Sequence, residues 1–189
     1  MGYALRSAVG PRAEGGSPQG PADLLAGASP EQGGATGGMG EGGPAQGGMP
    51  PQILAMVRSY KATLEKDPKN LEANVGMGNL EFDAGRMKAA ADYYTKALEV
   101  DPKNADVRVD RAVAYHSTGQ DPLAISELRR VTKENPAHAN AWLNLGVIAQ
   151  SMGDRAMTVR AWEEYLKIEP QSERSEAIRQ EVARLKTVR

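Results

Sequence analysis

Four equally spaced prolines constrain the fold more than any other feature of this chain. Pro68, Pro102, Pro136 and Pro170 follow one another at a constant period of 34. They lie in the segments DPKN, DPKN, NPAH and EPQS. A repeat of roughly 20 to 50 residues is typical of solenoids, because each unit buries its apolar face only by stacking on its neighbours. The spacing therefore predicts a linear stack of repeated units from about residue 52 onward.

Each period contains two helical patterns separated by a glycine. In the first period, Ala90, Tyr94 and Ala97 recur at three- and four-residue spacing, as on one face of a helix. Glycine suits the left-handed backbone at a helix end, and an X-Pro pair ends the helix that precedes it. The separating glycines are Gly85, Gly119 and Gly153. The sequence therefore predicts two helices per period.

Composition changes abruptly near Pro50. Residues 1–51 contain 15 Gly and 7 Pro, whereas the much longer remainder, 52–189, contains 6 Gly and 5 Pro. The first segment has too few large apolar side chains for burial to offset ordering entropy, so a disordered Gly/Pro-rich tether is expected. The remaining boundaries are an N-terminal capping helix at 52–66, repeats at 71–104, 105–138 and 139–172, and a C-terminal capping helix at 173–188, within a domain at 52–189.

The repeats resemble the tetratricopeptide repeat family over roughly residues 52–188. The third repeat carries the likeness best, with Trp142, Leu145, Gly146, Gly153, Trp162 and Pro170 at the family's preferred places. Arg111, Thr158 and Tyr165 depart from the pattern, and Arg111 is expected to extend its charge outward along its aliphatic stem or to loosen the second repeat. The resemblance implies an all-α, right-handed superhelical solenoid of antiparallel helix pairs that binds peptides on its concave face.

In this family the concave face is lined mainly by the first helix of each pair. The resemblance thus places there Glu72, Val75, Asn79, Phe82, Asp83, Asp106, Val109, Asp110, Val113, His116, Asn140, Leu143, Asn144, Val147 and Gln150. Packing between helices is an equally good explanation for the five aliphatic members of this set. The asparagines are the stronger candidates, because amides bind the backbone groups of an extended peptide.

A two-carboxylate clamp, used by chaperone-associated members of the family, needs Lys and Asn, then Asn, then Lys and Arg. The corresponding residues here are Val75, Asn79, Asp110, Asn140 and Asn144. Because the set contains no cation, the C-terminal carboxylate of a chaperone tail would not be captured. Glu72, Asp83, Asp106 and Asp110 instead favour a neutral or basic peptide, with an ordinary solvated acidic face as the alternative.

Other function classes receive no support from the sequence. The 23 basic and 24 acidic residues nearly cancel, which argues against nucleic acid or an anionic membrane as partner. There is no cysteine, and His116 and His138 belong to no hydrolase, metal or phosphate-binding motif. We therefore expect no catalytic residue, metal, cofactor or small-molecule substrate. Arg108, Arg129, Arg130 and Lys133 form a basic flank that we interpret as ordinary helix surface.

Three functions remain open. The first is a generic adaptor that holds a partner's peptide. The second follows from the segment Thr158–Pro170, which is similar to the repeats of bacterial c-type cytochrome maturation proteins and implies a periplasmic, membrane-tethered assembly factor whose true start lies upstream of Met1. The third is a scaffold that associates with its own tether or a second copy. As written, the sequence has no apolar run of about 18 residues. The compartment therefore stays open: cytoplasmic as written, or periplasmic and membrane-tethered if the true start lies upstream.

Overall fold

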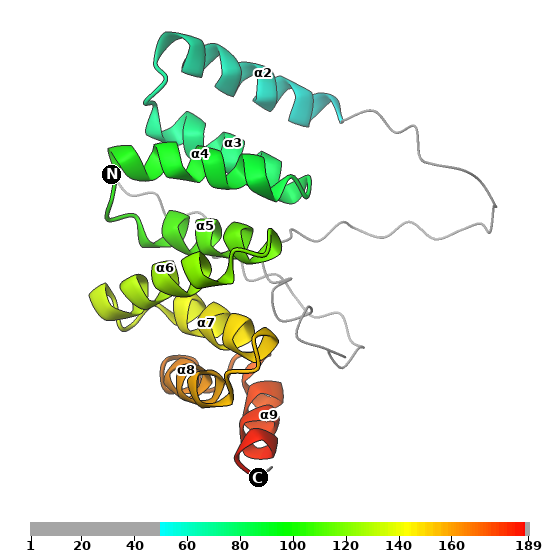
Figure 1. The fold of residues 1–189 in the computed structure, drawn as a ribbon. Coiled ribbons are helices and arrows are strands. Elements are labelled where there is room, and N and C mark those ends of the chain that lie inside the picture. Colours follow the sequence, from blue (N-terminus) through cyan, green and yellow to red (C-terminus); the bar gives the residue numbers. More distant parts are fainter. Residues whose placement is uncertain (1–49, 188–189) are drawn as a thin grey trace, which may run out of the picture.

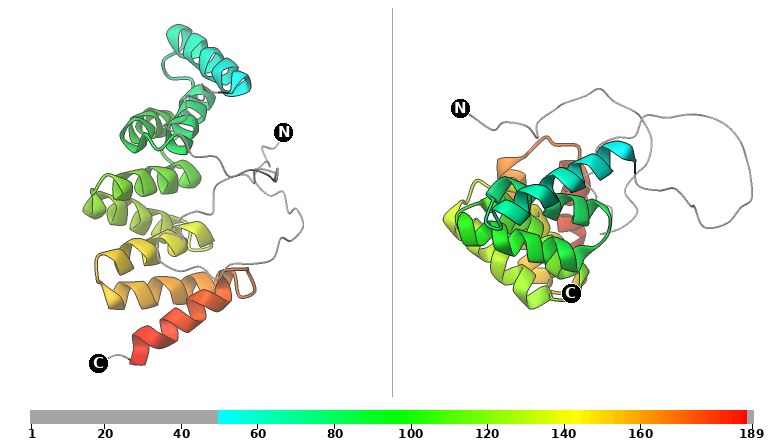
Figure 2. Two further views of the ribbon diagram at one scale, coloured as in Figure 1. Left: turned by 90° about the vertical axis from the view of Figure 1, so that its right-hand side faces the viewer. Right: turned by 90° about the horizontal axis from the view of Figure 1, so that it is seen from above.

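The computed structural model describes residues 50–187, which form eight helices and no strand (Figure 1). In chain order the helices are α2 (Pro51–Lys66), α3 (Leu71–Asp83), α4 (Met87–Val100), α5 (Ala105–Ser117), α6 (Asp121–Glu134), α7 (Ala139–Ser151), α8 (Arg155–Ile168) and α9 (Ser175–Thr187). Successive pairs stack in one direction from α2 to α9 (Figure 2). The predicted fold class is thereby confirmed. The predicted tether lies outside the described residues, except that Pro51 already begins α2.

The periodic proline segments form the turns between repeats. In the first, the carboxylate of Asp67 accepts from the amide of Lys69 at 3.2 Å, and Asn70 caps α3 by accepting from the amide of Ala73 at 3.0 Å. Asn104 caps α5 in the same way, and the ring of His138 replaces asparagine at the start of α7. These caps satisfy amides that the first turn of a helix leaves unpaired.

The carbonyl of each of the first three periodic prolines is also bound by a side chain on the helix that follows. Asn74 donates to Pro68 at 3.0 Å, Trp142 donates to Pro136 at 2.8 Å, and Arg108 donates to Pro102. Three different residue types thus make one equivalent hydrogen bond at the same position of successive repeats. This bond ties the start of each first helix to the turn before it.

Glycine is required at the turn inside each helix pair. Gly85, Gly119 and Gly153 have φ of +72°, +75° and +76°, a region that side chains with a Cβ disfavour. Because the three turns share this conformation, all three pairs fold back with similar geometry. This agrees with the role predicted for these glycines.

Within each pair, a small residue on the first helix faces a large one on the second. A Cβ added at Gly146 would lie 2.2 Å from the Trp162 ring, and one at Gly78 would lie 2.5 Å from the Tyr94 ring. The residues in the same register of the second repeat are Ala112 and Leu128, both fully buried. The rings of Tyr94 and Trp162 therefore pack against the first helix of their own repeat. Each ring also belongs to a core cluster with the next element, Val107 and Ala114 of α5 for Tyr94, and Ile178 and Val182 of α9 for Trp162.

The two terminal helices cover the stack unequally. On α9, Ile178 and Val182 are buried against α7 and α8, as a capping helix requires. No residue of α2 is buried, and Leu54 and Met56 remain 38% and 42% exposed. The helix α2 has the pattern of a second helix without its first, so only part of its apolar face has a neighbour among the described residues.

The three departures from the family pattern have separate explanations. Thr158 is fully buried, but its hydroxyl donates to the carbonyl of Asp154 at 2.8 Å. Tyr165 packs against α9 and forms a 2.7 Å hydrogen bond with the hydroxyl of Ser172. Arg111 does not extend outward. Its guanidinium lies 2.7 Å from the carboxylate of Glu127, which also holds the buried Arg108 at 2.7 Å. Arg108 therefore belongs to the interior and not to a basic flank.

Candidate peptide-binding site

The first-helix face is the surface formed by α3, α5 and α7, and it carries all fifteen residues predicted to bind a peptide. Four of them are exposed: Glu72, Asp83, Asp106 and Asn140. Another eight are half-buried: Val75, Asn79, Phe82, Asp110, Val113, His116, Asn144 and Gln150. The face thus combines polar side chains at its rim with partly accessible apolar ones between them.

The other three residues are buried and are not accessible to a ligand. Val109 is 4% exposed because it packs in one core cluster with Ala141 and Leu145 of α7. Leu143 and Val147 are 3% and 1% exposed because α9 covers them. For these three, the packing explanation holds. These residues are buried because each first helix packs against the first helix of the next layer, α5 against α7 and α7 against α9.

The amides of this face are partly engaged by the protein. The Oδ1 atom of Asn79 accepts from the Tyr94 hydroxyl at 2.9 Å, which fixes its side chain against α4. Asn144 donates to the carbonyl of Asn140 in its own helix at 2.9 Å. Gln150 donates to Glu181 of α9 at 2.7 Å. The asparagines therefore have structural roles that sequence reasoning did not include, and the prediction that they bind a ligand stays a prediction.

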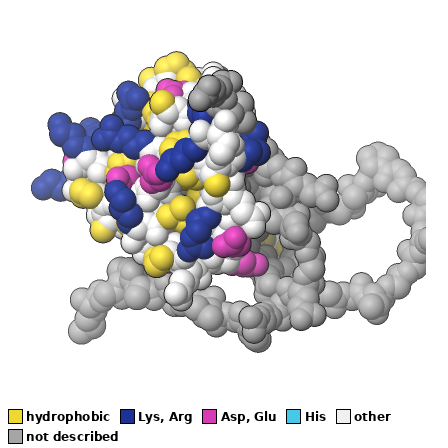
Figure 3. All heavy atoms as spheres, turned by 90° about the horizontal axis from the view of Figure 1, so that it is seen from below, with side chains coloured by type: hydrophobic (Ala, Val, Ile, Leu, Met, Phe, Trp, Pro, Cys, Tyr) yellow, Lys and Arg dark blue, Asp and Glu magenta, His cyan; other side chains and the backbone are white. Residues whose placement is uncertain are grey.

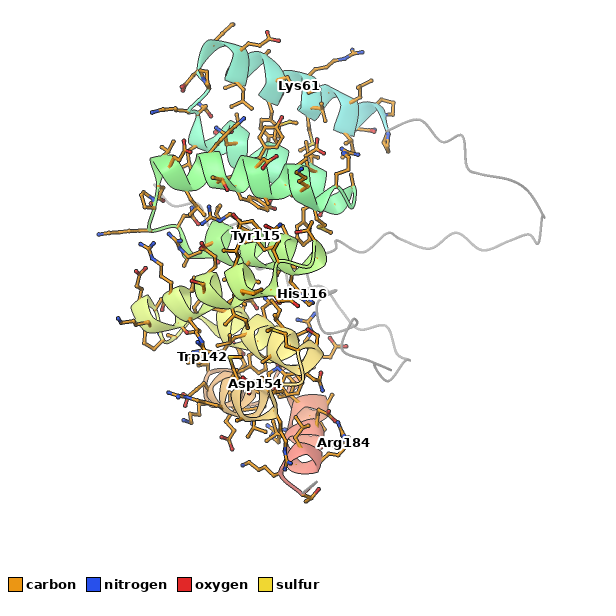
Figure 4. The ribbon with its side chains drawn as sticks, viewed as in Figure 1. Lys61, Tyr115, His116, Trp142, Asp154 and Arg184 are labelled. Carbon is orange, nitrogen blue, oxygen red and sulfur yellow. The ribbon has the colours of Figure 1, made fainter. Side chains whose placement is uncertain are left out.

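Both histidines bridge elements. The Nδ1 atom of His116 lies 2.6 Å from the carboxylate of Asp121, which joins the end of α5 to the start of α6 (Figure 4 labels His116). His138 accepts the Ala141 amide at Nδ1, so its Nε2 carries the proton that faces Asp106 at 3.1 Å. This hydrogen bond lowers the pKa of the Asp106 carboxyl below its ordinary value, against a smaller opposing effect of burial.

Charge on the first-helix face has one sign. Among its fifteen predicted positions, Glu72, Asp83, Asp106 and Asp110 carry carboxylates, and none is Lys or Arg. At the α9 end, the carboxylate of Glu181 is ion-paired with Arg184, and its pKa is lowered mainly by that hydrogen bond and further by one from Gln150. The face therefore presents a negative potential to whatever approaches α3 and α5.

Residues 50–187 contain neither a candidate metal site nor a candidate membrane-spanning helix. That part of the chain contains no group of three or more His, Asp or Glu side chains arranged to hold a metal ion. It also contains no helix that is long and apolar enough to span a membrane.

Comparison with known proteins agrees with this architecture. Stacked antiparallel helix pairs with this register define an all-α repeat protein. Residues 81–145 match the family model described as tetratricopeptide repeat. A search of curated protein sequences found no match.

Several solved structures share the fold. The MamA protein is 24% identical with a TM-score of 0.63, over 71% of this chain and 79% of MamA. The tetratricopeptide domain of Arabidopsis OM64 is 18% identical with a TM-score of 0.57, over 60% of this chain and 94% of that domain. The first such domain of Spaghetti (RPAP3), bound to the HSP90 peptide SRMEEVD, is 21% identical with a TM-score of 0.58, over 62% and 96% of the two chains. At these identities the likeness establishes the fold alone.

Proposed function

We propose that this protein is a non-catalytic adaptor whose first-helix face holds a neutral or basic peptide segment of a partner protein. The observation that carries the proposal is the one-signed charge of that face. Exposed Glu72 lies in the first turn of α3, and exposed Asp83 lies at its end, directly after the half-buried Phe82. A peptide with a lysine or arginine beside an apolar residue matches both features. Tetratricopeptide repeats commonly serve as such interaction modules.

The peptide bound in the RPAP3 structure allows the charge of the proposed ligand to be compared with that of a known one. The peptide SRMEEVD in the RPAP3 structure has three acidic side chains. In this chain the positions that correspond to the family's two-carboxylate clamp contain Val75, Asn79 and Asp110 in place of the family's Lys, Asn and Asn. Because none of these positions holds a cation and one holds a carboxylate, they offer an acidic peptide no charge-assisted hydrogen bond from Lys or Arg. The proposed ligand therefore differs in charge from that of RPAP3.

The experiment is a binding titration of the full chain with fluorescein-labelled GKALLKAG-amide, followed by anisotropy at low salt. The Glu72→Lys/Asp83→Lys variant is expected to weaken binding by at least about tenfold, because it reverses the charge of the face. The matched control is Asp92→Lys/Glu99→Lys, which makes the same charge change at exposed positions of α4.

Raising the salt concentration should weaken the wild-type complex, since exposed charges are screened beyond about 10 Å at 0.1 M. Equal loss of affinity in both variants would show a nonspecific charge effect and would count against the first-helix face. Binding that neither variant changes would place the peptide elsewhere.

A further inference from the structure

A cleft of about 650 Å³ lies between α6, α7 and α8. Its walls include the cations Arg129, Lys133 and Arg160, the half-buried indole of Trp142, and Met157. Figure 4 labels Trp142 and Asp154 on two of its walls. Lys and Arg side chains gather on the left of the face shown in Figure 3, which views the molecule from below. The cleft is therefore separate from the acidic first-helix face and opposite in charge.

The same location one repeat earlier contains an ion network. The residues that correspond there to Trp142, Leu145 and Ala161 are Arg108, Arg111 and Glu127. The carboxylate of Glu127 holds Arg108 and Arg111 at 2.7 Å each, and Arg111 also donates to Thr95 at 3.1 Å. At the junction of α4, α5 and α6, a carboxylate on the second helix thus lies against two guanidinium groups inside the structure.

The equivalent junction in the third repeat, between α6, α7 and α8, has no carboxylate at the position of Glu127. Ala161 occupies the position that corresponds to Glu127. Arg129, Lys133 and Arg160 occupy the positions that correspond to Thr95, Glu99 and Ser126 one repeat earlier. None of these three cations forms an ion pair with a residue in the range 50–187. The guanidinium of Arg129 lies 3.3 Å from the sulfur of Met157. Asp154 lines the cleft, but its Oδ1 atom already accepts the Met157 amide at 2.9 Å as the cap of α8.

We propose that this cleft binds an acidic peptide segment of a partner protein. A carboxylate of the peptide enters above Ala161, between Arg129, Lys133 and Arg160, and takes the place that Glu127 has one repeat earlier. An adjacent apolar side chain packs on Trp142 and Met157. Charge complementarity supports this occupant, since clustered unpaired cations favour carboxylates and arginine binds them with two parallel hydrogen bonds. The protein then holds two partners, one on each face.

The test uses the full chain and fluorescein-labelled GDELLEDG-amide. Wild type is expected to bind it and to change the emission of Trp142, since the other tryptophan, Trp162, is fully buried. Lys133→Glu/Arg160→Glu is expected to weaken binding by at least about tenfold. The matched control Arg58→Glu/Lys103→Glu makes the same charge change at exposed sites on α2 and in the α4–α5 turn and should bind normally.

A second variant, Ala161→Glu, places a carboxylate of the protein itself in the cleft, at the position proposed for the peptide's carboxylate. It is expected to block the peptide because its carboxylate can pair with Arg129, Lys133 or Arg160, which line the cleft. Unchanged helical circular dichroism shows that the variant is folded. Absence of binding to wild type, or equal binding to wild type and Lys133→Glu/Arg160→Glu, would overturn the proposal.

One further outcome would reassign the occupant. Residues 13–49 contain four acidic residues and no Lys or Arg. If Trp142 emission differs between wild type and Lys133→Glu/Arg160→Glu without peptide, and the difference disappears when these four are neutralised, the chain's own segment fills the cleft. That result would contradict binding of a partner.

Discussion

At the scale of single residues, packing inside each helix pair depends on matched side-chain sizes. Gly146 faces the Trp162 ring and Gly78 faces the Tyr94 ring, so a residue with no side chain is matched with a large aromatic ring. In the second repeat, the methyl group of Ala112 is matched with the smaller side chain of Leu128. The Trp162 ring has little freedom to move, because it is fully buried and its Nε1 donates to the carbonyl of Leu143 at 3.3 Å. Sizes at the two positions are therefore expected to be energetically coupled.

This coupling gives a double-mutant prediction. Gly146→Ala alone should destabilise the protein by about 1 to 3 kcal/mol, because its Cβ overlaps the Trp162 ring. Combined with Trp162→Leu, which reproduces the Ala112–Leu128 pair, the same alanine should cost about 1 kcal/mol less than it does alone. Urea unfolding of the four proteins measures the cycle. Additive losses would show that the two positions do not form one packing unit.

A second residue-level prediction concerns pH. His138→Asn should keep the cap of α7, as Asn70 and Asn104 do, while removing the hydrogen bond to Asp106. The pKa of the Asp106 carboxyl, lowered in wild type, should then rise toward the ordinary value of about 3.9. Carboxyl-carbon NMR titration measures it. An Asp106 pKa that is the same in both proteins would refute the assigned role of His138.

The sign of the stability effect follows from the direction of this shift. A lowered folded-state pKa stabilises the protein above the unfolded-state pKa, and the contribution is lost as the pH falls through the folded-state value. Wild type should therefore lose this contribution only below about pH 4, and His138→Asn should lack it at every pH. The effect is expected to be small because the Asp106 side chain is 87% exposed.

At the scale of elements, periodicity is sufficient to predict the six helices of the three repeats, because each pair has its own amphipathic patterns, a turn glycine between its helices and a proline segment after its second helix. All eight predicted helices are present. What periodicity does not supply is the partner of each side chain. The sequence predicts an outward-extending Arg111 because its actual partner, Glu127, lies 16 residues away on another helix. Likewise, Val109, Leu143 and Val147 match the register of lining residues, and only the position of the following helix shows that they are buried.

The terminal helices should differ in local stability. Since no residue of α2 is buried, its amides should exchange by local opening at a much lower free energy than those of α9, where Ile178 and Val182 anchor the helix. Native-state hydrogen exchange of the full chain compares the two helices directly, and both are terminal elements of the described stack. Equal protection would mean that α2 has a neighbour beyond the described contacts.

At the scale of the whole molecule, the solenoid separates two surfaces of opposite charge. The first helices carry the acidic positions, and the cleft between α6 and α8 carries the unpaired cations. The near-zero net charge of the chain concealed this separation, since 23 basic and 24 acidic residues cancel in any sum. Sequence analysis identified the first-helix face from the family resemblance. It did not identify the cleft, which emerges only when equivalent positions of successive repeats are compared in the structure.

The central claim is that a basic peptide binds on the first-helix face. The most direct measurement is an NMR titration of the isotope-labelled full chain with unlabelled GKALLKAG-amide, following every assigned backbone amide. We expect the shifts to concentrate on α3 and α5 around Glu72, Asp83, Asp106 and Val113, with little change on α6 and α8. Shifts confined to α4, α6 or α8, or no saturable shift at all, would contradict it.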